Sequence, residues 1–225
     1  HRLLDFGAKA LPNGFLAESY LRVDILMLAI FASDEAIGVY SFAALFIEGL
    51  YQIAAAIRVV INPVLVQLIK TGEKKHLAKF GRRIMTMCLS IFIPAIALTV
   101  CIFPHLNPFF PDDLISRAFP ILVILSCGLT LYAAYVPLDF ILMQAGQPEW
   151  QSCLMSFNIL TNIILNASLI PFYGIEGAAL ATAVAFAFSG INLNLAVWWR
   201  LGLRGGLLLA ETRFIKPSTL SEKCR

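Results

Sequence analysis

Charged residues are scarce in this chain of 225 residues. Asp, Glu, Lys and Arg together make up 14% of the sequence, whereas an average soluble domain has about 25%. Hydrophobic residues make up 59%, and the mean hydropathy is +0.80. This composition excludes an ordinary soluble domain, and the sequence therefore predicts an integral membrane protein.

The signatures of soluble enzymes and of metal sites are missing too. The sequence contains no Walker loop, no HExxH and no GxSxG motif, and its three histidines are scattered. Its five cysteines show no CxxC spacing, and four of them lie in or beside apolar runs, where Cys behaves as a small hydrophobe. We therefore expect no disulfide framework, no cluster of metal ligands, no nucleic-acid module and no catalytic residues of the usual soluble enzymes.

What the sequence does contain is a series of long apolar runs. A membrane-spanning helix needs about 20 apolar residues, and six runs come close to this length: 14–31, 37–61, 84–103, 118–143, 153–169 and 178–199. We therefore predict an all-α fold, a six-helix membrane bundle over residues 1–200 followed by a cytoplasmic tail over 201–225. Pro94 and Pro137 fall inside runs and should kink them. Because no signal pattern precedes the first run and the chain starts with His1, we expect it to be a piece of a longer protein.

The distribution of basic residues predicts the orientation of the bundle. The loop over 70–83 and the tail from Arg200 onward are rich in Lys and Arg, whereas the alternate turns carry Asp34, Glu35, Asp112 and Asp113. Basic loops stay on the cytoplasmic side, so both ends of this segment should be cytoplasmic in a plasma (cell inner) membrane. A patch for nucleic acid or anionic lipid would also be basic, but topology alone explains this loop.

Four ionisable residues lie inside the first two apolar runs: Arg22, Asp24, Glu48 and Arg58. A charge in a membrane span costs about 2.5–3.5 kcal/mol on insertion scales, so such residues are functional candidates. In the second run a polar seam recurs at steps of three and four residues, which places it on one helix face; its members are Glu48, Tyr51, Ala55, Arg58 and Asn62.

Their depths suggest which of these charges meet. Arg22, Asp24 and Glu48 lie ten to fourteen residues from the turn at Asp34, so in an antiparallel hairpin they occupy similar depths, and Arg22 should pair with a carboxylate. Such a pair would bind substrate or hold the hairpin together. Arg58 lies about 15 Å further inward, where it either faces a cavity open to the cytoplasm or extends to the inner interface.

A second group of polar residues lies in the last two runs. Asn158, Asn162 and Asn166 recur at four-residue steps, and Thr182 lies at a depth similar to that of Asn166. Together with Asp24, the oxygens of Asn162, Asn166 and Thr182 would form a site for Na⁺ or a shared proton, because alkali cations accept carboxylate, amide and hydroxyl ligands. Interhelical hydrogen bonding explains the same residues, and both interpretations stay open.

Several segments resemble the carboxy-terminal half of polysaccharide-biosynthesis (O-antigen-type) flippases, a branch of the multidrug/oligosaccharidyl-lipid/polysaccharide (MOP) exporter superfamily. They are RVDILML (22–28), SDEAIGVYSFA (33–43), AGQP (145–148) and IPFYGIEGAALATAVA (170–185). The resemblance implies two six-helix lobes around a cavity with alternating access, of which this chain is the second lobe and the amino-terminal lobe its missing partner.

The resemblance also implies the function, which is flipping of a polyprenyl-pyrophosphate-linked oligosaccharide across the bacterial cytoplasmic membrane. Arg22 and Arg58 would hold the anionic headgroup, while Asp24 and Glu48 would couple transport to Na⁺ or H⁺ or neutralise the arginines. The alternatives are a multidrug/cation antiporter of the same superfamily, part of a membrane-embedded glycosyltransferase or polymerase, and a remnant that no longer transports.

Overall fold

The structure is a computed structural model that describes residues 13–16, 19–20, 22–110 and 113–202. These residues form helices and contain no strand, which confirms the predicted all-α class. The elements are α2 (Val23–Phe31), α3 (Asp34–Thr71), α4 (Lys74–Ile102), the 3-10 helix η1 (Phe103–Phe109), α5 (Leu114–Ala133), the 3-10 helix η2 (Val136–Leu138), α6 (Ile141–Gln144) and α7 (Pro148–Leu201). In the described part of the chain, four helical stretches are long and apolar enough to cross a membrane.

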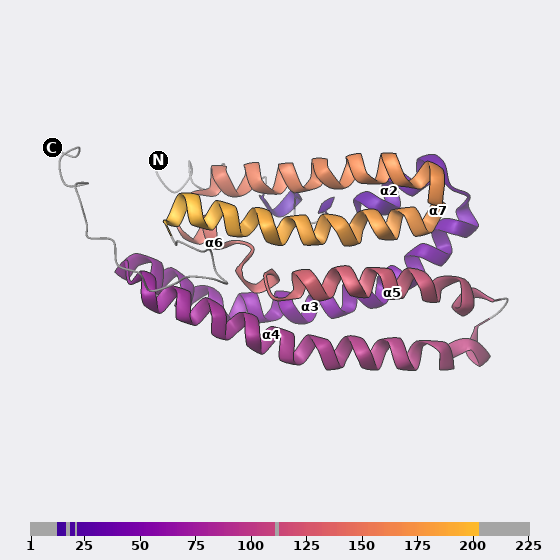
Figure 1. Cartoon of the computed structure of the whole chain (residues 1–225), viewed down its shortest axis with the longest axis horizontal. Coiled ribbons are helices and arrows are strands. Elements are labelled where there is room, and N and C mark those ends of the chain that lie inside the picture. Colours follow the sequence, from indigo (N-terminus) through magenta and orange to yellow (C-terminus); the bar gives the residue numbers. More distant parts are fainter. Residues whose placement is uncertain (1–12, 17–18, 21, 111–112, 203–225) are drawn as a thin grey trace.

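Helix α7 contains the last two predicted runs. Its backbone leaves the helical region at Gly174, where φ is 56° and ψ is −132°, a conformation that suits glycine because it has no Cβ. The two halves of α7 then lie antiparallel, as the orange and yellow rods of Figure 1 show. The predicted runs 153–169 and 178–199 therefore lie on either side of this turn.

The fourth predicted run, 118–143, does not form one continuous helix. Helix α5 ends at Ala133, and residues 134–144 follow an irregular path through η2 and α6 (Figure 1). Pro137 lies in η2, where its missing N–H prevents a regular helix. Non-helical backbone at membrane depth is tolerated where protein buries it, and residues 136–139 are buried. Pro94, by contrast, is accommodated inside the continuous helix α4.

The turns between helices gather at two ends of the bundle. Ser33 caps α3 by accepting a hydrogen bond from the backbone N–H of Ala36. The turn between α2 and α3 lies at the same end as the turn inside α7, whereas the turn between α3 and α4 lies at the other end (Figure 1). There Lys74 lies against Gly202, just beyond α7. The basic loop and the end of α7 thus share one end, as the topology argument requires. Which side of the membrane that end faces stays a prediction.

Two apolar clusters fill the interior, one toward each end. The first surrounds Tyr40, Leu125 and Phe186, and the second surrounds Leu65 and Leu138. Each cluster is bordered by a polar group that includes residues of the α3 seam. These two polar groups are the candidate functional centres.

Candidate functional site: two polar centres along helix α3

The first centre is built around Asp24 in the first turn of the short helix α2. Its side chain lies inside the bundle, and the residue is only 6% exposed. The Tyr40 hydroxyl donates a hydrogen bond of 2.5 Å to Oδ2, whereas Oδ1 is buried without a hydrogen-bond partner among the described residues. A buried carboxylate oxygen without a partner carries a full desolvation penalty, so this atom is a natural place for a bound cation or proton.

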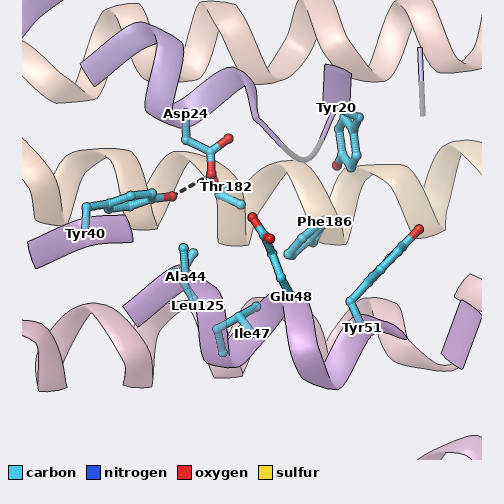
Figure 2. Close-up of a pocket in the computed structure, with 10 residues that line it drawn as sticks. All are labelled: Tyr20, Asp24, Tyr40, Ala44, Ile47, Glu48, Tyr51, Leu125, Thr182 and Phe186. Carbon is cyan, nitrogen blue, oxygen red and sulfur yellow. Dashed lines mark hydrogen bonds between the residues drawn. The ribbon is translucent and has the colours of Figure 1, made fainter. Parts of the chain in front are cut away.

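Asp24 opens onto a cavity of about 30 Å³ between α2, α3, α5 and α7, which is room for one or two water molecules or a small ion. In Figure 2 the carboxylates of Asp24 and Glu48 enter it from opposite helices, and Thr182 lies between them. The lining residues are Tyr20, Asp24, Tyr40, Ala44, Ile47, Glu48, Tyr51, Leu125, Thr182 and Phe186. None of these is basic, so the charge of this cavity favours a cation.

The other predicted cation ligands lie beside this cavity with part of their bonding capacity unused. Thr182 and Asn162 lie close enough to the Asp24 carboxylate to interact with it, yet Thr182 Oγ1, Asn162 Nδ2 and Asn166 Oδ1 are buried and have no partner at full hydrogen-bond geometry in the described structure. Asn166 Nδ2 donates to Asn162 Oδ1 at 2.6 Å. The Asn162 oxygen keeps a second lone pair, whereas the oxygens without any hydrogen-bond partner belong to Asp24, Thr182 and Asn166. Asn158, further from the turn at Gly174, instead accepts a hydrogen bond from Asn192 at 2.8 Å.

Arg22 does not join this centre. It precedes α2 and is exposed, and the described residues include no ion pair between Arg22 and Asp24 or Glu48. The pairing that equal depth predicts is thus not formed in this structure, because a tyrosine hydroxyl, and not a guanidinium, compensates Asp24. Equal depth places residues on one level, but it does not fix the direction of their side chains around the helix.

The second centre joins Arg58 of α3 to Asp139 in the irregular segment after α5. Arg58 Nη1 donates to both carboxylate oxygens of Asp139 at 2.9 Å. The guanidinium carbon lies 4.6 Å from the centre of the Phe140 ring, within the range of a cation–π contact. Gln151 Nε2 holds the backbone carbonyl of Asp139 at 2.8 Å. The exposed fraction is 19% for the Arg58 side chain and 8% for the Asp139 side chain, so Arg58 is the accessible partner.

The sequence analysis missed Asp139, although the signal was available. Asp139 is a carboxylate inside the predicted fourth run, which is the criterion that singled out Asp24. It follows Pro137 by two residues, and interrupted helices mark binding sites in many transporters.

The polar seam of α3 faces the protein interior as its spacing predicts. Glu48 and Tyr51 line the cavity, Arg58 reaches Asp139, and Asn62 accepts a hydrogen bond from Gln144 in α6. One helix face therefore connects the acidic cavity to the irregular segment, over a distance of about 15 Å from Glu48 to Arg58.

Comparison with known families identifies a match over most of the chain. A model of the MatE family matches residues 13–168. The matched stretch includes both centres except for Thr182 and Phe186.

Relatives with curated names include membrane proteins and flippases. The probable flippase AglR of Haloferax volcanii is 28% identical over 186 residues, 77% of this chain and 37% of AglR. The probable low-salt glycan biosynthesis flippase Agl15 of the same organism is 24% identical over 172 residues, 76% of this chain and 36% of Agl15. The uncharacterized membrane protein YabM of Bacillus subtilis is 28% identical over 141 residues, 62% of this chain and 26% of YabM. The chain thus spans about a third of the length of these relatives.

Two solved structures share the fold. One is an outward-facing multidrug resistance MATE transporter of the MOP superfamily, with a TM-score of 0.67 and 17% identity. The other is a MOP superfamily transporter from Pyrococcus furiosus described by the reverse polarity of its binding pocket, with a TM-score of 0.64 and 17% identity. Each match covers 96% of this chain and 48% of the other.

Proposed function

The chain belongs to the MatE family of the MOP transporter superfamily, and we propose that it forms one lobe of a flippase for a polyprenyl-pyrophosphate-linked oligosaccharide in the cytoplasmic membrane. The chain covers about half of each solved transporter, and a second six-helix lobe would complete the central cavity. Membership of a transporter family favours transport over the glycosyltransferase alternative.

The observation that carries the choice of substrate is the Arg58 centre. Arg58 keeps a charged, partly exposed guanidinium within a long membrane-spanning helix, between the Phe140 ring and the Asp139 carboxylate. A guanidinium binds phosphate oxygens through paired, charge-assisted hydrogen bonds, and the lipid tail of the substrate can stay in the bilayer meanwhile. The relatives AglR and Agl15 are both named as probable flippases, and the name of Agl15 refers to glycan biosynthesis, which supports flipping of a glycan-linked substrate. The exposed Arg22 would contact the headgroup in another state of the transport cycle.

The Asp24 cavity supplies the coupling site in this proposal. An ion or proton that binds the free Oδ1 of Asp24, with Thr182 and Asn166 as further ligands and Glu48 facing the same cavity, would neutralise the buried carboxylate. Binding there would change the contacts between α2, α3 and α7, because the cavity residues come from all three helices. Downhill movement of Na⁺ or H⁺ would in this way drive the change of access.

The test is a flipping assay on the two-lobe transporter in proteoliposomes. We expect a fluorescent polyprenyl-pyrophosphate sugar in the inner leaflet to become accessible outside when a Na⁺ or H⁺ gradient is applied. The Arg58→Lys variant should flip more slowly at equal abundance, because lysine lacks the planar fork. Unchanged flipping in Arg58→Ala at normal abundance would remove Arg58 from the headgroup site.

A multidrug/cation antiporter is the second candidate, and a specific observation favours it. The cavity is lined by two carboxylates and several aromatic rings without a basic residue, which suits an organic cation, and one structural neighbour is a multidrug transporter. The cavity of about 30 Å³ is nevertheless far smaller than typical drug pockets of about 300–1,000 Å³. Efflux of ethidium without flipping of the lipid-linked sugar would establish this candidate instead.

A further inference from the structure

The carboxylate that faces Arg58 belongs to Asp139, in the irregular segment between α5 and α6. Its position there suggests how the site exchanges anions. We propose that Asp139 is an internal counter-anion that occupies Arg58 while the site is empty and that a phosphate or pyrophosphate group displaces it on binding. This inference rests on the proposed headgroup role of Arg58 and adds a second residue, which tunes the affinity of the site without contacting the substrate.

The geometry of the ion pair leaves the guanidinium suited to a second anion. Both hydrogen bonds to Asp139 come from Nη1 alone, each at 2.9 Å. The strongest pairing of a guanidinium uses two different nitrogens in a parallel fork, and Asp139 does not use that fork. An anion with several oxygens can bind through this fork. It then gains more interaction free energy with Arg58 than is lost when the Asp139 carboxylate leaves.

The surroundings of the two side chains differ in the way that displacement requires. Phe140 lies over the guanidinium, so an aromatic face still supports the charged group when the carboxylate moves away. The Arg58 side chain is 19% exposed, which leaves a path for an incoming anion, while Asp139 is buried behind it at 8%. An incoming anion therefore reaches the Arg58 guanidinium before it reaches Asp139.

The backbone at Asp139 permits the carboxylate to move. Asp139 lies outside a regular α-helix, and its N–H makes a long bond of 3.4 Å to the Val136 carbonyl. Its own carbonyl is held by Gln151 of α7, whose Oε1 is buried without a hydrogen-bond partner in the described structure. Gln151 therefore holds the main chain at Asp139. The Asp139 side chain can rotate with little loss of backbone hydrogen bonding.

The experiment measures binding of inorganic pyrophosphate to the full chain in nanodiscs at fixed ionic strength. We expect Asp139→Asn to bind pyrophosphate at least tenfold more tightly than the wild type, because the competing charge is gone while the amide still fills the space. The Arg58→Ala/Asp139→Ala double variant, in which charge stays balanced, should lose binding. Glu176→Gln, which removes an exposed carboxylate near Gly174, is the matched control and should bind like the wild type.

The outcomes separate this inference from the proposed function. Equal affinities of the wild type and Asp139→Asn, with binding lost in the double variant, would overturn the counter-anion role and leave Arg58 as the headgroup residue. If pyrophosphate binds neither the wild type nor Asp139→Asn, or binds the double variant undiminished, both the counter-anion role of Asp139 and the headgroup role of Arg58 are overturned.

A second measurement on the wild type covers the case in which Asp139→Asn does not fold. A hydrophobic carbodiimide should label Asp139 more in the presence of pyrophosphate than in its absence, as quantified by mass spectrometry, because displacement frees the carboxylate from Arg58. Labelling that pyrophosphate leaves unchanged or reduces would overturn the proposal.

Discussion

The two centres along α3 compensate a buried carboxylate in opposite ways. Asp24 is held by the neutral hydroxyl of Tyr40 and keeps one free oxygen beside a cavity, whereas Asp139 has both oxygens bonded to the cation Arg58. No cationic side chain compensates the Asp24 carboxylate in the described structure, whereas Arg58 already compensates Asp139. This difference teaches that a buried charge alone does not identify its ligand. We expect the Asp24 centre to attract a cation, and we propose that the Arg58 centre exchanges its internal anion for another.

The largest effect should come from breaking the Arg58 centre on one side. Arg58→Ala leaves Asp139 buried without its counter-charge, and the loss of one partner of a buried ion pair costs about 3–5 kcal/mol in free energy of unfolding. The Arg58→Ala/Asp139→Ala variant should recover much of this loss, which denaturation in mixed micelles can measure.

The exposed ion pair between Arg117 and Glu35 is the control for this prediction. Its side chains are 46% and 74% exposed, so Arg117→Ala should cost about 0–1 kcal/mol. A double variant at 58 and 139 that is no more stable than Arg58→Ala would show that the two charges do not compensate each other.

The Asp24 centre should respond less strongly to loss of its neutral partner. Tyr40→Phe removes the hydrogen bond of 2.5 Å to the Asp24 carboxylate, and a hydrogen bond to a charged group contributes about 1.5–3 kcal/mol. Tyr173→Phe, at a tyrosine that is 59% exposed, should leave the free energy of unfolding unchanged. Equal stability of both variants would mean that Asp24 is neutral and does not need the hydroxyl.

A smaller effect should follow from Asn166→Ala. This change removes the bond to Asn162, and such bonds within membrane proteins contribute about 0.6 kcal/mol on average. If Asn166 is also a cation ligand, the variant should additionally lose part of the increase in melting temperature that Na⁺ gives the wild type. An unchanged Na⁺ response would assign Asn166 to hydrogen bonding within α7 alone.

The orientation can be tested with changes that should not affect stability. In a chain without its native cysteines, Lys74→Cys and Glu176→Cys place thiols at opposite ends of the bundle (Figure 1). An impermeant thiol reagent added to intact cells should label position 176 and not position 74. The reverse pattern would invert the topology and place the Arg58 centre nearer the outside.

The sequence predicted the fold class well, because hydropathy and spacing report directly on the solvent and on the helix face. The seam at Glu48, Tyr51, Arg58 and Asn62 was predicted to share one helix face, and in the structure its members contact other helices of the bundle. The break after Ala133 could be predicted only in part, since Pro137 indicates a kink but does not determine where the helix resumes.

The partners of the buried charges were harder to predict from the sequence. Arg58 meets Asp139, which lies 81 residues away, and Asp24 meets Tyr40 across a helical hairpin. Depth along a helix follows from residue counting, whereas rotation about the helix axis depends on packing against distant segments. Residue counting placed Arg22 at the depth of the Asp24 centre but did not give its rotation about the helix axis. In the structure Arg22 lies exposed.

We propose that helix α3 connects a cation site to an anion site, and the melting temperature of the full chain with each ligand tests both sites. At fixed ionic strength, replacing choline by Na⁺ should raise the melting temperature of the wild type and of Arg58→Ala/Asp139→Ala, but not that of Asp24→Asn. Pyrophosphate should raise the melting temperature of the wild type and of Asp24→Asn, but not that of the double variant. If the melting temperature changes with pH in place of Na⁺, and Asp24→Asn abolishes this change, the bound cation is the proton. A Na⁺ response that persists in Asp24→Asn, or a pyrophosphate response that persists without Arg58, would contradict the two proposed sites.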